Sequence, residues 1–176
     1  MYIYSSNIFS IVTSYSNPLG SGNRNGMIVY SQFGNTLTAN YPTLGTIIFN
    51  GFFTPDNVGY ANGPALGTWM MFDFGTPRII QEVKWYQDTS WNMGTWQWQG
   101  SNDSVNWSNI GGNFILGIGI VTSVLDPYNS TYRNESVQTQ TSLNDNRIAY
   151  RYYKLSGVSG TMSYTPYIHE IEFKIN

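Results

Sequence analysis

The chain has 176 residues, the length of one ordinary domain. Only 10% of the residues are charged, and eight basic against ten acidic side chains give a net charge of −2. The basic residues form no run, which argues against nucleic acid as a partner. Because there is no cysteine, disulfides, thiolate metal sites and thiol nucleophiles are excluded.

Neutral polar and aromatic side chains dominate the rest of the composition. Aromatic residues make up 16% of the chain and include fourteen tyrosines. Amides, hydroxyls and tyrosines suit neutral, hydroxyl-rich ligands, because they stack and hydrogen-bond without charge. A β-rich protein from an AT-rich genome would have a similar composition, so composition alone leaves both interpretations open.

The first 45 residues differ in character from the rest of the chain. Residues 1–45 are rich in Ser, Asn and Gly and alternate only weakly, which predicts either edge strands or an extension that docks on a neighbouring subunit. No basic, apolar leader is evident, so no signal peptide is predicted. The longest apolar run, residues 114–121, is far shorter than the roughly twenty residues of a membrane span, so no membrane insertion is expected.

Residues 46–176 contain short apolar or alternating segments separated by turns rich in Gly, Asn, Asp and Pro. No segment sustains a helical apolar period. One further strand is predicted in the first 45 residues, at residues 27–33. The other predicted strands cover residues 46–49, 68–74, 79–87, 95–101, 136–142, 148–156 and 167–175. Many short strands of this kind predict an all-β sandwich or barrel.

Two of these strands show which side chains should be internal. In residues 167–175, His169, Ile171 and Phe173 share one face, while charged residues share the other. Trp96 and Trp98 are also two residues apart, so they point to one face of their strand. We expect both tryptophans in the core.

Four segments resemble, in the same order, motifs of the coagulation factor V/VIII C-domain, or discoidin, family. They are TWMMFDFGTPRIIQEVKWY, WQWQGSNDSVNWSNIG, YRYYKLSGVSG and PYIHEIEFKI, and IFNGFFT is a weaker match. The resemblance covers roughly residues 46–176, without a clear counterpart for residues 112–146. It implies a jelly-roll β-sandwich of the galactose-binding-like type, similar to carbohydrate-binding modules, whose loops at one end bind sugars, glycans or phospholipid head groups.

The resemblance also implies which of the remaining tryptophans are buried and which is exposed. It implies that Trp107 packs under the sheet and that Trp69 and Trp85 belong to the core. Trp91 lies between two predicted strands and is left as the tryptophan expected to be exposed on a loop.

A site for a neutral sugar needs a flat aromatic face and fixed hydrogen-bonding groups. Trp91 and Asn92 supply both in adjacent loop residues. Further candidates, expected in other loops, are Tyr60, Tyr128, Arg133 and Tyr164. The alternative is that the loop aromatics fill the end of the sandwich or contact another subunit.

The resemblance further implies one structural calcium ion, held by the early loop at residues 50–54 and by the last strand. The corresponding ligands are Asn50, Thr54 and Glu170. Asn50 replaces the family's aspartate with a neutral amide, so calcium affinity should be lower. The alternative is that Glu170 accepts hydrogen bonds from loop amides without an ion.

No catalytic motif accompanies these features. The sequence lacks a P-loop, zinc-ligand spacing and a nucleophile elbow, and no pair of carboxylates stands out. We therefore expect a non-enzymatic, lectin-like module that recognises cell-surface glycans, in the context of viral or phage host attachment, at an extracellular or virion surface.

Two other interpretations remain open at this stage. The chain could be a structural virion or fibre component, forming a homo-oligomer or larger assembly through its aromatic loops. Binding to a membrane surface would require basic residues beside exposed apolar ones, and the basic residues are few and scattered.

Overall fold

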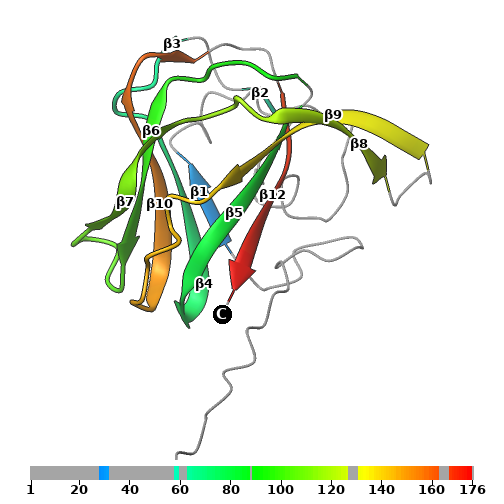
Figure 1. Cartoon of the computed structure of the whole chain (residues 1–176). Helices are drawn as coiled ribbons and strands as arrows, with labels where there is room; N and C mark the ends of the chain where they lie inside the picture. Colours follow the sequence, from blue (N-terminus) through cyan, green and yellow to red (C-terminus); the bar gives the residue numbers. More distant parts are fainter. Residues whose placement is uncertain are drawn as a thin grey trace, which may run out of the picture.

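The computed structural model of the chain describes residues 28–31, 58–59, 63–87, 89–126, 131–162 and 167–175. Two five-stranded antiparallel sheets face one another, with a small two-stranded sheet at one end (Figure 1). The predicted all-β sandwich is therefore confirmed. None of these residues is helical, so none forms a helix with the length and apolarity needed to cross a membrane.

The first sheet has the order β1-β4-β10-β6-β7. Its strands are β1 (Ile28–Ser31), β4 (Trp69–Arg78), β10 (Tyr150–Ser159), β6 (Thr95–Ser101) and β7 (Ser108–Ile115). Strand β1 comes from the N-terminal 45 residues and forms one edge of this sheet by pairing with β4.

The second sheet has the order β2-β12-β5-β9-β8. Its strands are β2 (Val58–Gly59), β12 (Tyr167–Ile175), β5 (Ile80–Gln87), β9 (Thr131–Gln140) and β8 (Ile120–Asp126). The two-stranded sheet pairs β3 (Gly63–Pro64) with β11 (Thr161–Met162). The consecutive strands β7 and β8 are edges of different sheets, so the chain crosses between the sheets there.

The sequence did not predict β7 and β8. Both are edge strands, and most of their described side chains are exposed, so neither shows the alternation of a half-buried strand. Strand β7 also contains two adjacent glycines, Gly111 and Gly112, which are rare within strands. The predicted strand at residues 46–49 lies outside the described residues.

An aromatic cluster centred on Phe173 joins the two sheets. The Phe173 ring, on β12, lies 4.9 Å from the ring of Phe72 and 5.2 Å from that of Phe74, centroid to centroid. It lies 5.9 Å from the ring of Trp98 on β6. All three contacts are edge-to-face, the arrangement that aromatic quadrupoles favour. One side chain of the second sheet thus contacts two strands of the first.

Three fully buried tryptophans have internal acceptors for their indole N–H groups. Trp96 Nε1 donates to the Met93 carbonyl oxygen at 2.8 Å. Trp98 Nε1 donates to Gln140 Oε1 at 2.7 Å, and Trp85 Nε1 donates to Gln87 Oε1 at 2.8 Å. The predicted core positions of Trp96, Trp98 and Trp85 are confirmed.

The expectation for two other tryptophans was wrong. Trp69 is half-buried on the face of β4 opposite the buried Met70 and Phe72. Trp107 is also only half-buried, and its ring packs against the Lys154 ammonium, 4.0 Å from Nζ to the ring centroid. Motif position alone did not reveal which face of the sheet each residue occupies.

Replacing the central ring tests the role of the cluster. We expect Phe173→Ala to lower the free energy of unfolding by about 3 to 5 kcal/mol, because it leaves a cavity among three rings. Val105→Ala, at a side chain that is 76% exposed, should change it by about 0.5 kcal/mol or less. Urea denaturation followed by circular dichroism measures both, and similar losses for the two variants would contradict a central role for Phe173.

Candidate functional site

Trp91 lies on the loop that joins β5 to β6, which crosses the upper end of the sandwich in Figure 1. Its side chain is 54% exposed, whereas Trp85, Trp96 and Trp98 are fully buried. The predicted exposure of Trp91 is therefore confirmed. An aromatic face of this size at the end of a sandwich is available for stacking.

Backbone hydrogen bonds hold the Trp91 loop against the turn that follows β7. The Trp91 N–H donates to the Gly117 carbonyl at 3.0 Å, and the Met93 N–H donates to the Leu116 carbonyl at 2.9 Å. In the other direction, the Leu116 N–H donates to the Gly94 carbonyl at 3.0 Å. The exposed indole is thus carried by an anchored backbone.

Two glutamines fix the turn itself. Gln87 Nε2, at the end of β5, donates to the Gly117 carbonyl at 2.9 Å. From β9, Gln138 Oε1 accepts from the Gly117 N–H at 2.7 Å, and its Nε2 donates to the Ile115 carbonyl at 2.6 Å. A loop ordered in advance loses less conformational entropy when a ligand binds.

The second predicted residue, Asn92, shapes the same loop. Its Oδ1 accepts from the Gly94 N–H at 2.8 Å, and Gly94 has a φ of 87°. Asn92 is exposed, and within the described part of the chain no residue accepts a hydrogen bond from its Nδ2. The Nδ2 group of the residue next to Trp91 is therefore available to donate to a ligand.

The side chains of the other four sugar-site candidates lie outside the described part of the chain. Tyr60, Tyr128 and Tyr164 lie outside the described residues. Arg133 pairs with Val124 between β9 and β8, but its side chain is not among those described. Their contribution to a site stays a prediction.

The calcium site also stays a prediction. Asn50 and Thr54 lie outside the described residues, and Glu170 is placed only by its backbone, opposite Tyr86 of β5. Among the side chains that are described, no three His, Asp or Glu residues gather as they would around a metal ion.

Two carboxylates within the family-like segments, Asp73 and Asp103, have structural partners here. Asp73 accepts two hydrogen bonds from the Arg151 guanidinium, at 2.8 and 2.9 Å. These bonds are the main reason that the pKa of Asp73 is lowered. Asp103 accepts from the Asn106 side chain and from the backbone N–H groups of Asn106 and Val105, and these bonds lower its pKa as well. Asp73 thus links β4 to β10, and Asp103 fixes the turn after β6.

Sequence reasoning did not single out the glutamines that support the loop. The sequence pattern could have indicated that Gln87 is buried, because it shares one face of β5 with Val83 and Trp85. In the structure its side chain is 1% exposed. A glutamine in that register must find polar partners inside the protein. Which carbonyls it reaches depends on the crossing from β7 to β8, which the sequence did not predict.

No protein-family model matches the sequence, and no curated protein is a significant match. The chain is similar in structure to chitosan-binding module 1 of a chitosanase/glucanase from Paenibacillus sp. IK-5, with a TM-score of 0.49 and 16% identity over 88% of this chain and 98% of that one. It is similar to CBM32-1 of a family 31 glycoside hydrolase from Clostridium perfringens, with a TM-score of 0.46 and 13% identity over 86% and 98%.

A third similar structure is the CBM32 of AlyQ, solved in complex with 4,5-unsaturated mannuronic acid, with a TM-score of 0.42 and 16% identity over 82% of this chain and 92% of that one. These neighbours are carbohydrate-binding modules with discoidin-type, or galactose-binding-like, β-sandwiches, the type that the sequence motifs resemble. At this distance the likeness concerns the fold alone.

A glycine substitution tests whether the turn positions the Trp91 loop. Gly117 has a φ of 88°, and a Cβ there would overlap the Trp91 carbonyl oxygen. We expect Gly117→Ala to cost about 2 kcal/mol of stability or more and to shift the backbone NMR signals of residues 91–94.

Gly112→Ala is the matched control, because a Cβ at Gly112 meets no atom within 4 Å. It should leave those NMR signals in place and change stability by about 0.5 kcal/mol or less. Equal effects of the two substitutions would show that the turn does not position the loop.

Proposed function

We propose that the protein is a non-enzymatic carbohydrate-binding module that holds a neutral sugar against Trp91. The observation that carries this proposal is an indole that is 54% exposed on a loop anchored by hydrogen bonds to the neighbouring turn. The indole offers an apolar face to the C–H side of a sugar ring, and the Asn92 amide offers a donor to a hydroxyl.

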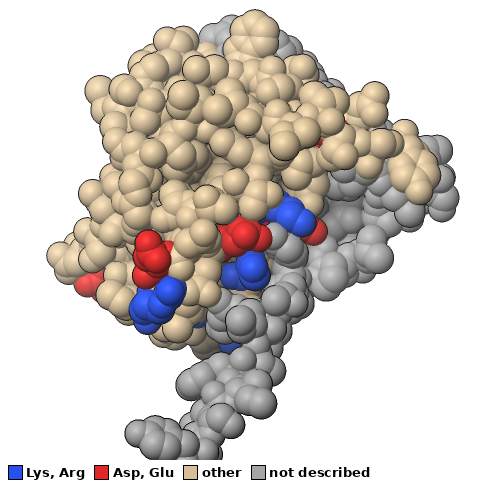
Figure 2. Space-filling model, in the orientation of Figure 1, with Lys and Arg blue, Asp and Glu red and all other residues tan. Residues whose placement is uncertain are grey.

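The distribution of charge supports a neutral ligand. The turn at residues 115–119 contains no charged residue, and the loop between β5 and β6 contains one, Asp88 at its start. Most of the charged side chains visible in Figure 2 lie in the lower half of the molecule, away from this end. A ligand bound at the upper end would therefore be recognised by stacking and neutral hydrogen bonds.

The wider role we propose is recognition of cell-surface glycans, at an extracellular or virion surface, as in viral or phage host attachment. The low charge, the abundance of Asn and Tyr and the distinctive N-terminal segment support this context. One exposed tryptophan gives a weak contact, so attachment would depend on several copies binding together. The proposal includes a calcium ion held by Asn50, Thr54 and Glu170.

A structural role is the second candidate, and the edge strand β8 supports it. Ile118, Ile120 and Val121 are 51%, 79% and 56% exposed, an apolar series that a second subunit would cover. In that case the chain would sediment as an oligomer, and Ile120→Asp would convert it to a monomer. A wild-type protein that sediments as a monomer would exclude this role.

A glycan array tests the sugar site. We expect the purified chain, presented multivalently, to bind a defined set of neutral glycans, and Trp91→Ala to weaken that binding about 30-fold or more, because the central aromatic contact is lost. Ile148→Ala is the control, because Ile148 is equally exposed, at 58%, but lies in another loop.

The array is run with calcium and with a chelator. Loss of binding on chelation would support the calcium ion, whereas unchanged binding would exclude a functional role for it. If no glycan binds, or if Trp91→Ala binds as the wild type does, the proposed sugar site is wrong.

A further inference from the structure

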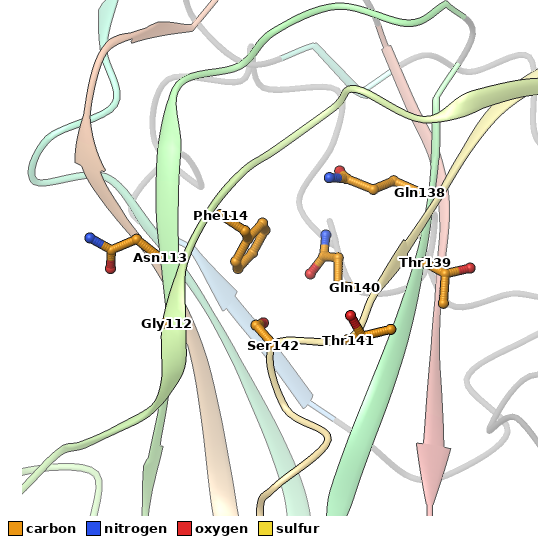
Figure 3. Close-up of a pocket in the computed structure, with 8 residues that line it drawn as sticks. All are labelled: Gly112, Asn113, Phe114, Gln138, Thr139, Gln140, Thr141 and Ser142. Atoms are coloured by element: carbon orange, nitrogen blue, oxygen red, sulfur yellow. The ribbon is translucent and has the colours of Figure 1, made fainter.

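A groove separate from the Trp91 loop opens between β7, an edge strand of the first sheet, and β9, which lies next to the edge strand of the second sheet (Figure 3). Its volume is about 350 Å³. Its principal side chains are Phe114 on β7, Gln138 and Gln140 on β9, and Thr141 and Ser142 after β9. No charged residue lines the groove.

Both ends of the groove are closed by specific contacts. At one end, the side chain of Gln138 spans to β7 and the turn after it through hydrogen bonds with Ile115 and Gly117. At the other end, Gly111 packs so closely on the backbone of Ser142 that no Cβ would fit. Contacts between the two sheets thus limit the groove at both ends.

The inward face of β9 is polar where a sandwich normally buries apolar side chains. Ser136, Gln138 and Gln140 alternate along this face, and Ser136 and Gln140 are 0% and 3% exposed. Burying polar groups is unfavourable unless each group has a partner. Departures from the apolar pattern of this kind are expected at functional sites.

Gln140 is the decisive residue, because its orientation is fixed by chemistry. The indole N–H of Trp98 can only donate, so the oxygen of Gln140 must face it, at 2.7 Å. Both N–H groups of Gln140 Nε2 therefore remain available to donate hydrogen bonds. Figure 3 shows this side chain beside the ring of Phe114, between the two strands.

No described residue accepts a hydrogen bond from Gln140 Nε2, although the residue is only 3% exposed. The hydroxyls of Ser136 and Ser142 are likewise buried without a partner in the described part of the chain. Of these three residues, Gln140 and Ser142 line the groove, whereas Ser136 does not. A ligand with several oxygen atoms would satisfy groups of this kind.

We propose that this groove is a second ligand site, which takes a neutral, hydroxyl-bearing ring the size of a monosaccharide. An oxygen of the ligand accepts from Gln140 Nε2, after displacing the half-buried ring of Phe114 that lies next to it. The displaced ring then packs against the apolar face of the sugar, and Thr141 provides a hydroxyl at the exposed rim.

The size and character of the groove agree with such a ligand. Its volume, about 350 Å³, is at the lower end of the range for small-molecule sites. The lining is uncharged, which disfavours phosphorylated or carboxylated ligands. The groove shares no lining residue with the Trp91 loop, although Gln138 also holds the turn that anchors this loop, so the Gln140 amide and the Trp91→Ala variant are used to distinguish the two sites.

NMR on the full-length chain tests the proposal directly. Galactose, glucose, mannose and N-acetylglucosamine are titrated separately into the ¹⁵N-labelled protein to about 50 mM, well above the dissociation constants of weak complexes. We expect at least one sugar to shift the side-chain amide signals of Gln140 and Gln138. Trp91→Ala should leave these shifts unchanged.

Two substitutions examine the contacts. Gln140→Glu keeps an oxygen for the indole of Trp98 but removes the donor, and we expect it to weaken binding about tenfold or more. Thr141→Val changes only an exposed rim hydroxyl, so it tests the groove even if Gln140→Glu fails to fold. Thr122→Val, at an exposed side chain on β8 outside the groove lining, is the matched control and should bind as the wild type does.

Three outcomes would overturn the proposal. The first is that no sugar shifts the two amide signals. The second is that Gln140→Glu, or Thr141→Val where the former does not fold, binds as tightly as the wild type. The third is a long-lived water that contacts the Gln140 amide and stays in place throughout every titration, which would show that an ordered water alone occupies the groove.

Discussion

The edge-to-face packing of Phe173 on Phe72, Phe74 and Trp98 determines how the two sheets face each other. Once the sheets are fixed in this way, the indole N–H of Trp98 meets the Gln140 amide from the opposite sheet. The buried aromatic residues therefore fill the core and also position polar groups through their N–H donors.

In this protein, glutamine side chains make internal hydrogen bonds that charged side chains often make in other proteins. Each carboxamide donates and accepts at once, so Gln87 accepts from the indole of Trp85 while it donates to the carbonyls of Thr89 and Gly117. Gln138 makes a similar pair of contacts with the turn after β7. Neutral amides can be buried at lower cost than ions, which agrees with a chain that is only 10% charged.

The part of the fold that could be predicted from the sequence is the part with a clear side-chain period. Alternation correctly placed Trp96 and Trp98 in the core, as it did Ile171 and Phe173 on β12. Edge strands such as β7 and β8 carry no such period because both of their faces are largely exposed.

The candidate site was predictable to a similar degree, since the exposure of Trp91 was expected from its place between two strands. Its anchoring was not, because Gln87 and Gln138 come from neighbouring strands of the second sheet and only the three-dimensional arrangement brings both to Gly117.

Three tryptophans, Trp85, Trp96 and Trp98, are fully buried and support the structure, Trp69 and Trp107 are half-buried, and Trp91 is the one that we propose binds the ligand. The most direct measurement follows the indole N–H signals of the six tryptophans by ¹H–¹⁵N NMR while a glycan that the array identifies is added. This division of roles predicts that the Trp91 signal shifts with saturation, while those of Trp85, Trp96 and Trp98 stay in place because their donors are engaged inside the protein. Binding that leaves the Trp91 signal unmoved would contradict it.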